Sequence, residues 1–205
     1  MGISEIFTAD WWKTNWKLVV TAVIVILFPY IGGSIGGGIV ASGEIDTWYA
    51  QVNRPTWQPP NWLFGPAWAV LYFCMGLASF LVWKDGRKQS KAEIEQTCYF
   101  GWSEYTTISK VAMGLYLVSI ALNWAWTPVF FGLHRVLDSF AIIVVLDVVV
   151  FCSIFVFFKI NKAAGLLMVP YLCWISFATA LNVAIWQLNC DVDGVFLTIS
   201  ECAAL

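Results

Sequence analysis

Five long, nearly uncharged apolar segments constrain this chain more than any other feature of its sequence. They cover residues 18–40, 61–83, 111–133, 139–158 and 163–188. A helix of about 20 mostly apolar residues crosses a bilayer, and helices satisfy their own backbone hydrogen bonds, as lipid requires. Of all residues, 60% are hydrophobic and only 12% are charged, which is outside the soluble range. We therefore predict an all-α integral membrane protein with a bundle of five transmembrane helices.

The segments outside the five spans, and their charges, predict the domain boundaries and the orientation of the bundle in the membrane. We expect residues 1–17 to lie along the membrane surface, residues 18–190 to form the transmembrane domain with a polar loop at 84–110, and residues 191–205 to form a tail. An odd number of spans places the termini on opposite sides. Nine of the 11 lysines and arginines fall on the N-terminal side, which by the positive-inside rule faces the cytoplasm. In an outer mitochondrial membrane this rule need not hold.

Composition argues against several classes of function. The net charge is −2, and no basic run indicates nucleic-acid binding. The six cysteines are scattered without a CxxC pair, so they resemble small buried hydrophobes rather than a disulfide framework. His134 is the single histidine, so a histidine-based metal centre has no further ligands. We predict neither a metal nor a cofactor.

A stiff loop rich in proline and tryptophan leads into the second span. The loop and the start of the span together read WYAQVNRPTWQPPNWLFGPAW, from residue 48 to residue 68, with the span beginning at residue 61. The prolines of the loop restrict the backbone and exclude a helix, so we interpret the loop as a lid. Trp57 and Trp62 could equally belong to an interfacial aromatic belt. Trp68 and Tyr72, spaced i and i+4, share one helix face and are expected in a pocket wall.

Polar and aromatic residues recur at similar depth on spans three and five. Asn123 and Trp126 share a face at i and i+3, and a buried amide must either tie helices together or face a ligand. Trp174, Ala178 and Leu181 form a stripe at i, i+4 and i+7, which is more often packing than pocket. Their agreement in depth with span two favours a cavity between these helices.

A glycine-rich stretch in the first span and an acidic residue in the fourth span each need a contact elsewhere in the protein or with a ligand. In the first span, the IGGSIGGG stretch after Pro29 leaves a strip without side chains. Helix packing is the favoured interpretation of this strip, and ligand contact is the minority one. Asp147 lies within the fourth span, where an ionised carboxylate costs about 2.5 to 3.5 kcal/mol. It is therefore expected to be protonated, paired or facing the bundle interior, with a functional role as the default hypothesis.

Three motifs in order make a family resemblance specific. WYAQVNRPTWQPPNWLFGPAW, ALNWAWTPVFFG and PYLCWISFATALN closely resemble the translocator protein family (TspO, also called the peripheral-type benzodiazepine receptor). The resemblance implies a five-helix bundle, commonly a homodimer, with a cavity beneath the loop. It implies as ligands porphyrins or haem-related tetrapyrroles, sterols and benzodiazepine-site compounds. It also implies the outer mitochondrial membrane, with the endoplasmic reticulum or a bacterial membrane as alternatives.

The resemblance also implies a set of ligand-binding residues. The cavity lining would be Trp68, Tyr72, Asn123, Trp126, Trp174, Ala178 and Leu181, and the lid side would be Asn61, Leu63 and Pro66. The proposed sterol motif of animal members needs a Tyr and an Arg after Leu-Asn. Here residues 181–187 read LNVAIWQ, so a sterol site at this position is in doubt.

The leading hypothesis is a membrane ligand-binding protein that holds a flat, largely apolar molecule and transports it if the lid opens. A second hypothesis is enzymatic and comes from the resemblance, which implies light-dependent porphyrin degradation with Trp68 and Trp174 as the reacting groups. The sequence places no ordinary acid, base or nucleophile near the expected cavity, so this chemistry would depend on the excited porphyrin itself. A third is a regulatory scaffold whose loop at 84–110 binds a partner.

Overall fold

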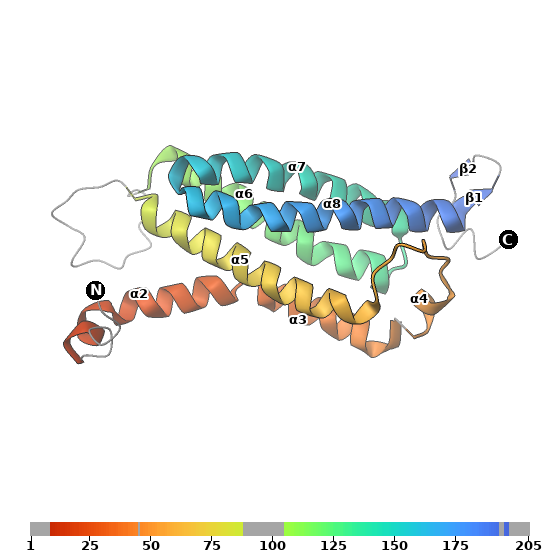
Figure 1. Cartoon of the computed structure of the whole chain (residues 1–205), viewed down its shortest axis with the longest axis horizontal. Helices are drawn as coiled ribbons and strands as arrows, with labels where there is room; N and C mark the ends of the chain where they lie inside the picture. The colour runs from red at the N-terminus through yellow and green to blue at the C-terminus, as the bar shows by residue number, and fades with distance from the viewer. Residues whose placement is uncertain (1–8, 45, 88–104, 193–194, 197–205) are drawn as a thin grey trace.

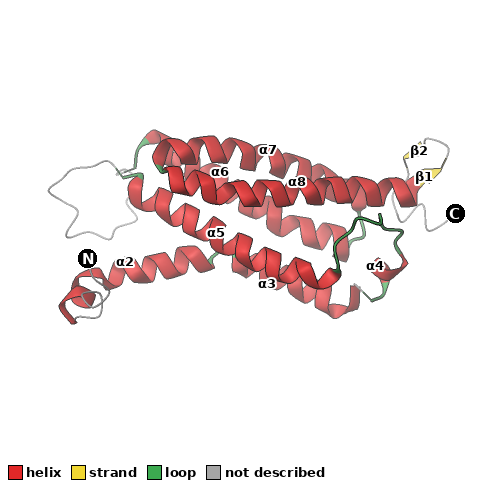
Figure 2. Ribbon diagram, in the orientation of Figure 1, coloured by secondary structure: helices red, strands yellow, loops and turns green. Residues whose placement is uncertain are grey.

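A computed structural model describes residues 9–44, 46–87, 105–192 and 195–196. Five long helical segments lie side by side along one axis (Figure 1), and helix dominates the chain (Figure 2). Each is long and apolar enough to cross a membrane, which confirms the predicted five-helix membrane bundle. The segments are α2–α3 (Ala9–Leu27, Tyr30–Ile39), α5 (Phe64–Asp85), α6 (Thr107–Thr127), α7 (Val136–Ile160) and α8 (Lys162–Cys190).

Short elements complete the described chain. The π-helical turns η1 (Val40–Glu44) and η4 (Pro128–Gly132) extend α3 and α6, and α4 (Trp48–Gln51) and the 3-10 turn η2 (Asn61–Leu63) flank the lid loop. Strands β1 (Asp191–Val192) and β2 (Val195–Phe196) pair antiparallel near the C-terminus. Of the polar loop predicted at 84–110, residues 88–104 lie outside the described residues, as does most of the predicted tail.

Helix boundaries follow local chemistry. Pro29 separates α2 from α3, because proline cannot continue the backbone hydrogen-bond ladder. Thr106 accepts a hydrogen bond from the Ser109 N–H and caps α6, so this helix begins before the apolar segment that predicted it. Residues 9–17, expected at the membrane surface, form the first turns of α2. Their position relative to the bilayer stays a prediction.

The helices pack around a continuous core. α7 packs against α6 and α8, α8 packs against α5, and α5 packs against α2. Met75, Val82 and Val150 have no exposed side-chain surface. At Gly76 a Cβ atom would lie 2.3 Å from the Ile26 carbonyl oxygen, so the missing side chain permits the close approach of α2. Large apolar side chains such as Phe151 are exposed on the outer faces, where a bilayer would surround them.

The lid loop is fastened to the end of α8. It lies with α4 at the end of the bundle that also carries the C-terminal strands (Figure 1). The Asn53 backbone N–H donates to Asn189 Oδ1 at 2.9 Å, and Asn189 Nδ2 donates back to the Asn53 carbonyl oxygen at 2.9 Å. These two bonds join segments 136 residues apart and position the loop over this end of the bundle.

Asp147 has two hydrogen-bond donors on the neighbouring helix. Its carboxylate accepts from Ser176 Oγ at 3.2 Å and from Thr179 Oγ1 at 2.7 Å. The residue is half-buried on α7, and its donors lie on α8. These hydrogen bonds link α7 to α8 through the carboxyl group. Its protonation state stays a prediction, and it forms no salt bridge within the described residues.

We predict that Ser176→Ala combined with Thr179→Val weakens the α7–α8 contact. The double substitution keeps volume but removes both donors, and a hydrogen bond between membrane helices contributes about 0.6 to 1.7 kcal/mol. Thermal unfolding in nanodiscs should show a loss of about 1 kcal/mol. Adding Asp147→Leu should restore most of that loss, because no polar group is then left unpaired. Equal stability of the double variant and the wild type would contradict this assignment.

Candidate functional site

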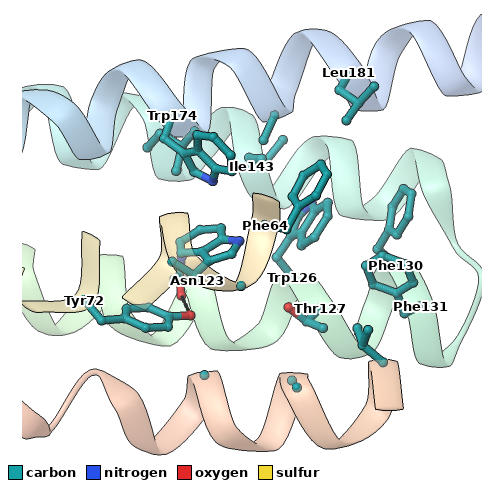
Figure 3. A pocket seen from close by; sticks show the side chains of 18 of the residues that line it. Phe64, Tyr72, Asn123, Trp126, Thr127, Phe130, Phe131, Ile143, Trp174 and Leu181 are labelled. Carbon is teal, nitrogen blue, oxygen red and sulfur yellow. Dashed lines mark hydrogen bonds between the residues drawn. The ribbon is translucent and has the colours of Figure 1, made fainter. Parts of the chain in front are cut away.

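A cavity of about 400 Å³ lies within the bundle at the lid end. It is bounded by α3, α5, α6 and α8, with Ile143 and Leu146 of α7 at the back. Figure 3 shows the side chains of Phe64, Trp126 and Trp174 reaching into the space between these helices. Its size and its mainly apolar, aromatic lining are those of a small-molecule site.

The structure brings together most of the residues that the sequence pointed to. Eight of them line this one cavity: Asn61, Trp68, Tyr72, Asn123, Trp126, Trp174, Ala178 and Leu181. Leu63 and Pro66 are outside the lining. For Pro66 the reason is helical geometry. Residues 64, 68 and 72 lie on one face of the helix because they are four residues apart, whereas Pro66 lies on the opposite, exposed side.

The two loop tryptophans also lie outside the lining. Trp57 is 49% exposed and Trp62 is 71% exposed, and neither borders the cavity. Trp57 packs edge-on against Phe177 of α8, with ring centroids 5.7 Å apart. This placement agrees with the aromatic-belt alternative for these two residues.

Interlocking aromatic rings make the cavity wall. Trp68 stacks on Tyr72 with centroids 5.3 Å apart, and Trp174 stands edge-on to both Phe64 at 5.7 Å and Trp68 at 6.4 Å. Aromatic pairs in these geometries add about 0.5 to 1.5 kcal/mol each beyond area burial. The rings therefore support one another and present flat apolar faces.

Asn123 joins three helices at the wall of the cavity. Tyr72 on α5 donates its hydroxyl to Asn123 Oδ1 at 3.0 Å (Figure 3), and Asn123 Nδ2 donates to the hydroxyl oxygen of Tyr171 on α8 at 3.0 Å. The amide is 5% exposed and also lines the cavity. The structure shows that Asn123 ties helices together and borders the candidate site; that it faces a ligand stays a prediction.

Three buried polar atoms on cavity-lining residues have no hydrogen-bond partner among the described residues. They are the indole Nε1 atoms of Trp126 and Trp174 and the Oδ1 atom of Asn182. Asn182 Nδ2 is already used, since it donates to Ser139 Oγ at 2.9 Å. Leaving a buried polar group unpaired costs about 1 to 3 kcal/mol. Residues of the cavity wall thus carry two donors and one acceptor that are unpaired among the described residues, each with almost no accessible surface.

The glycine strip of α3 packs against α6 and also borders the cavity, while ligand contact stays a prediction. A Cβ at Gly32 would overlap the Trp124 ring at 2.0 Å, and one at Gly36 would touch Thr127, so these glycines allow α3 to pack on α6. Gly33 and Gly37 line the cavity. A Cβ at Gly37 would meet nothing within 4 Å, which leaves open space above the backbone there.

A hydrogen-bonded bridge crosses the mouth of the cavity. The Tyr49 hydroxyl donates to Gln58 Oε1 at 3.0 Å, and Gln58 Nε2 donates to Asn61 Oδ1 at 3.2 Å. Burial raises the pKa of the Tyr49 hydroxyl to about 12, although the positive charge of Arg54 acts in the opposite direction. The hydroxyl therefore stays protonated and keeps its role as donor at physiological pH.

His134 contacts two other segments of the chain beside the mouth of the cavity. Its Nε2 lies 2.9 Å from Glu44 Oε2, and its ring stacks on Trp48 with centroids 4.3 Å apart and an interplanar angle of 12°. It links the α6–α7 turn to the end of the first span and to α4. The single histidine thus has a structural role in this arrangement.

Sequence reasoning missed part of the lining. The missed residues include Tyr30, Ser34, Val40, Tyr49, Phe64, Thr127, Phe130, Phe131, Ile143, Leu146, Ile175, Asn182 and Ile185. Five of them carried a usable signal, because each lies four residues from an expected lining residue: Phe64, Thr127, Phe130, Asn182 and Ile185. Phe130, four residues after Trp126, stacks on its ring with centroids 4.9 Å apart. Phe131 lies beside it in the π-helical turn η4 and has no such spacing.

Comparison with known proteins agrees with this architecture. The model of the TspO/MBR family matches residues 25–187. The chain is 33% identical to the translocator protein of Homo sapiens over 170 residues, covering 83% of this chain and 90% of the relative. It is 35% identical over 173 residues to the tryptophan-rich protein TspO of Archaeoglobus fulgidus, covering 84% and 97%.

A third relative, the tryptophan-rich sensory protein of Cereibacter sphaeroides, is 37% identical over 144 residues, covering 70% of this chain and 78% of the relative. The region that the family model matches begins within the first membrane span, ends near the end of the fifth and includes every residue of the cavity lining. The chain is therefore an integral membrane protein that belongs to the TspO/MBR family.

Proposed function

We propose that this protein binds a flat, largely apolar ligand of the porphyrin or haem-related tetrapyrrole class in the cavity beneath the lid. The observation that carries the proposal is an aromatic cavity whose buried Trp126 and Trp174 indole N–H groups and Asn182 carbonyl oxygen lack partners in the described chain. Stacking on indole faces and burial of apolar area supply affinity. The three unpaired groups would orient the polar atoms of the ligand.

If the lid opens, a bound ligand can leave the cavity, and the protein would then transport it. Side-chain amides help to hold the lid, namely the Asn53–Asn189 pair and the Tyr49–Gln58–Asn61 bridge, and Tyr49 and Val52 also pack in an apolar cluster. Each hydrogen bond contributes only about 0.5 to 1.5 kcal/mol, so opening of the lid would break bonds that are individually weak. The relatives named translocator protein support this direction. A homodimer and an outer mitochondrial location, expected from the resemblance, remain predictions, as do sterols and benzodiazepine-site compounds as ligands.

Light-dependent porphyrin degradation is a second candidate function. Its two proposed reacting groups, Trp68 and Trp174, lie in the same wall with ring centroids 6.4 Å apart. Any bound porphyrin stacked there would meet both indoles. Illuminating the loaded protein and following loss of porphyrin absorbance tests this chemistry separately from binding. The scaffold hypothesis depends on loop residues 88–104, which are outside the described residues.

We expect Trp68→Phe combined with Trp174→Phe to weaken tetrapyrrole binding at least about tenfold, or about 1.4 kcal/mol. The smaller rings reduce stacking, and the Trp174 donor is lost. The measurement is a dark titration with protoporphyrin in nanodiscs, followed by tryptophan quenching. Trp62→Phe is the control, because it removes an exposed fluorophore outside the cavity. Unchanged affinity in the double variant would remove these residues from the site.

Filling the cavity from α3 gives a sharper test. Gly37→Leu places an apolar side chain in the open space of the cavity, since a Cβ there meets no atom within 4 Å. We expect protoporphyrin affinity to fall by about tenfold or more while the melting temperature stays close to that of the wild type.

Gly38→Leu is the matched control for this substitution. Gly38 also has no atom within 4 Å of a Cβ, but it is exposed and outside the lining. The same helix-propensity change therefore occurs without filling the cavity. Equal affinity losses in both variants would show that the cavity is not the binding site.

A further inference from the structure

The mouth of the cavity differs chemically from its interior. Beside the aromatic cavity lies an open hollow in the lid loop, lined by polar and proline residues that include Asn53, Arg54 and Gln58. Asn61 borders both spaces. A ligand that fills the apolar interior can therefore extend a polar edge past Asn61 into this hollow.

Arg54 is the cation placed at this edge. Its guanidinium carbon lies 5.2 Å from the centroid of the Tyr49 ring, and Tyr49 lines the cavity. The residue before it, Asn53, is fixed to Asn189 of α8 by two hydrogen bonds of 2.9 Å. The Asn53–Asn189 hydrogen bonds and the contact with the Tyr49 ring hold the Arg54 guanidinium next to the cavity mouth.

The charge of Arg54 is not used by an ion pair in the described part of the chain. At the same end of the bundle, Arg135 pairs with Asp138, and Glu44 pairs with His134. Both of those acidic groups are therefore committed elsewhere. The guanidinium presents a planar fork of donors, a geometry that matches carboxylate groups.

We propose that Arg54 is a specificity-determining residue that binds a carboxylate on the rim of the ligand, so that the site prefers acidic tetrapyrroles over neutral ones. This inference rests on the proposed tetrapyrrole-binding function. The apolar body of the ligand lies among the indole rings, and its acidic edge lies at the mouth against Arg54. A neutral flat molecule of the same size gains nothing from this contact.

The test compares protoporphyrin with its dimethyl ester, which has the same ring but no carboxylate charge. Both are titrated in the dark, near neutral pH, into nanodiscs of zwitterionic lipid that contain wild-type protein, Arg54→Gln, Arg54→Lys or Arg135→Gln. Arg135→Gln is the matched control, since it removes a cation at the same end of the bundle that is already paired with Asp138.

We expect Arg54→Gln to weaken binding of the diacid about fivefold, the effect of losing a solvent-exposed ion pair. Binding of the ester should change by less than about twofold in the same variant, which amounts to less than about 0.4 kcal/mol. Arg54→Lys should bind the diacid more tightly than Arg54→Gln, because it keeps the positive charge. Arg135→Gln should bind both the diacid and the ester as tightly as the wild type does. The difference between diacid and ester should also shrink at high salt, because exposed charges are screened.

Other outcomes would overturn the inference in distinguishable ways. Equal weakening of diacid and ester in Arg54→Gln would show that Arg54 supports the lid structurally. Unchanged binding of both ligands would show that its charge plays no part. If the wild type bound neither ligand, the proposed tetrapyrrole function itself would fail, and this inference with it.

Discussion

The hydrogen bonds of Asn123 are the interaction on which the geometry of the cavity depends. Lipid offers no water to a polar group, so an amide within a membrane helix must find partners inside the protein. Asn123 finds them in Tyr72 and Tyr171, which fixes α5, α6 and α8 relative to one another. With these helices fixed, Trp68 and Trp174 meet across the cavity. These bonds join the three helices that carry most of the aromatic wall of the cavity.

The same constraint makes the unpaired groups informative. Several polar side chains in the spans have partners, such as Asp147 with Ser176 and Thr179, and Asn182 Nδ2 with Ser139. The indole N–H groups of Trp126 and Trp174, which belong to residues of the cavity lining, lack them in the described chain. The proposed function assigns these two groups to a ligand that carries polar atoms.

The interior of the cavity and its mouth offer a ligand different kinds of contact. Inside, contact is aromatic and discriminates mainly by shape, because stacking tolerates many flat molecules. At the mouth, Arg54 adds a charge, and the Tyr49–Gln58–Asn61 bridge adds amide and hydroxyl groups. The lid carries this polar chemistry on a backbone that proline stiffens and that Asn189 anchors. Under the proposed function, the interior supplies affinity and the lid supplies selectivity.

The sequence by itself determined the five helices, because bilayer thickness and backbone hydrogen bonding leave a chain with five uncharged apolar segments little alternative. It also determined which helix faces carry aromatic and amide groups, since helical periodicity depends on local spacing alone; Trp68 with Tyr72 and Trp174 with Ala178 are examples. Only the tertiary structure decided that these faces meet in one cavity, that Pro66 points away from it, and that Phe130 and Phe131 close it. It alone paired Asp147 with α8 and Asn53 with Asn189. Such contacts join residues far apart in the chain and depend on how whole helices pack, which no local pattern encodes.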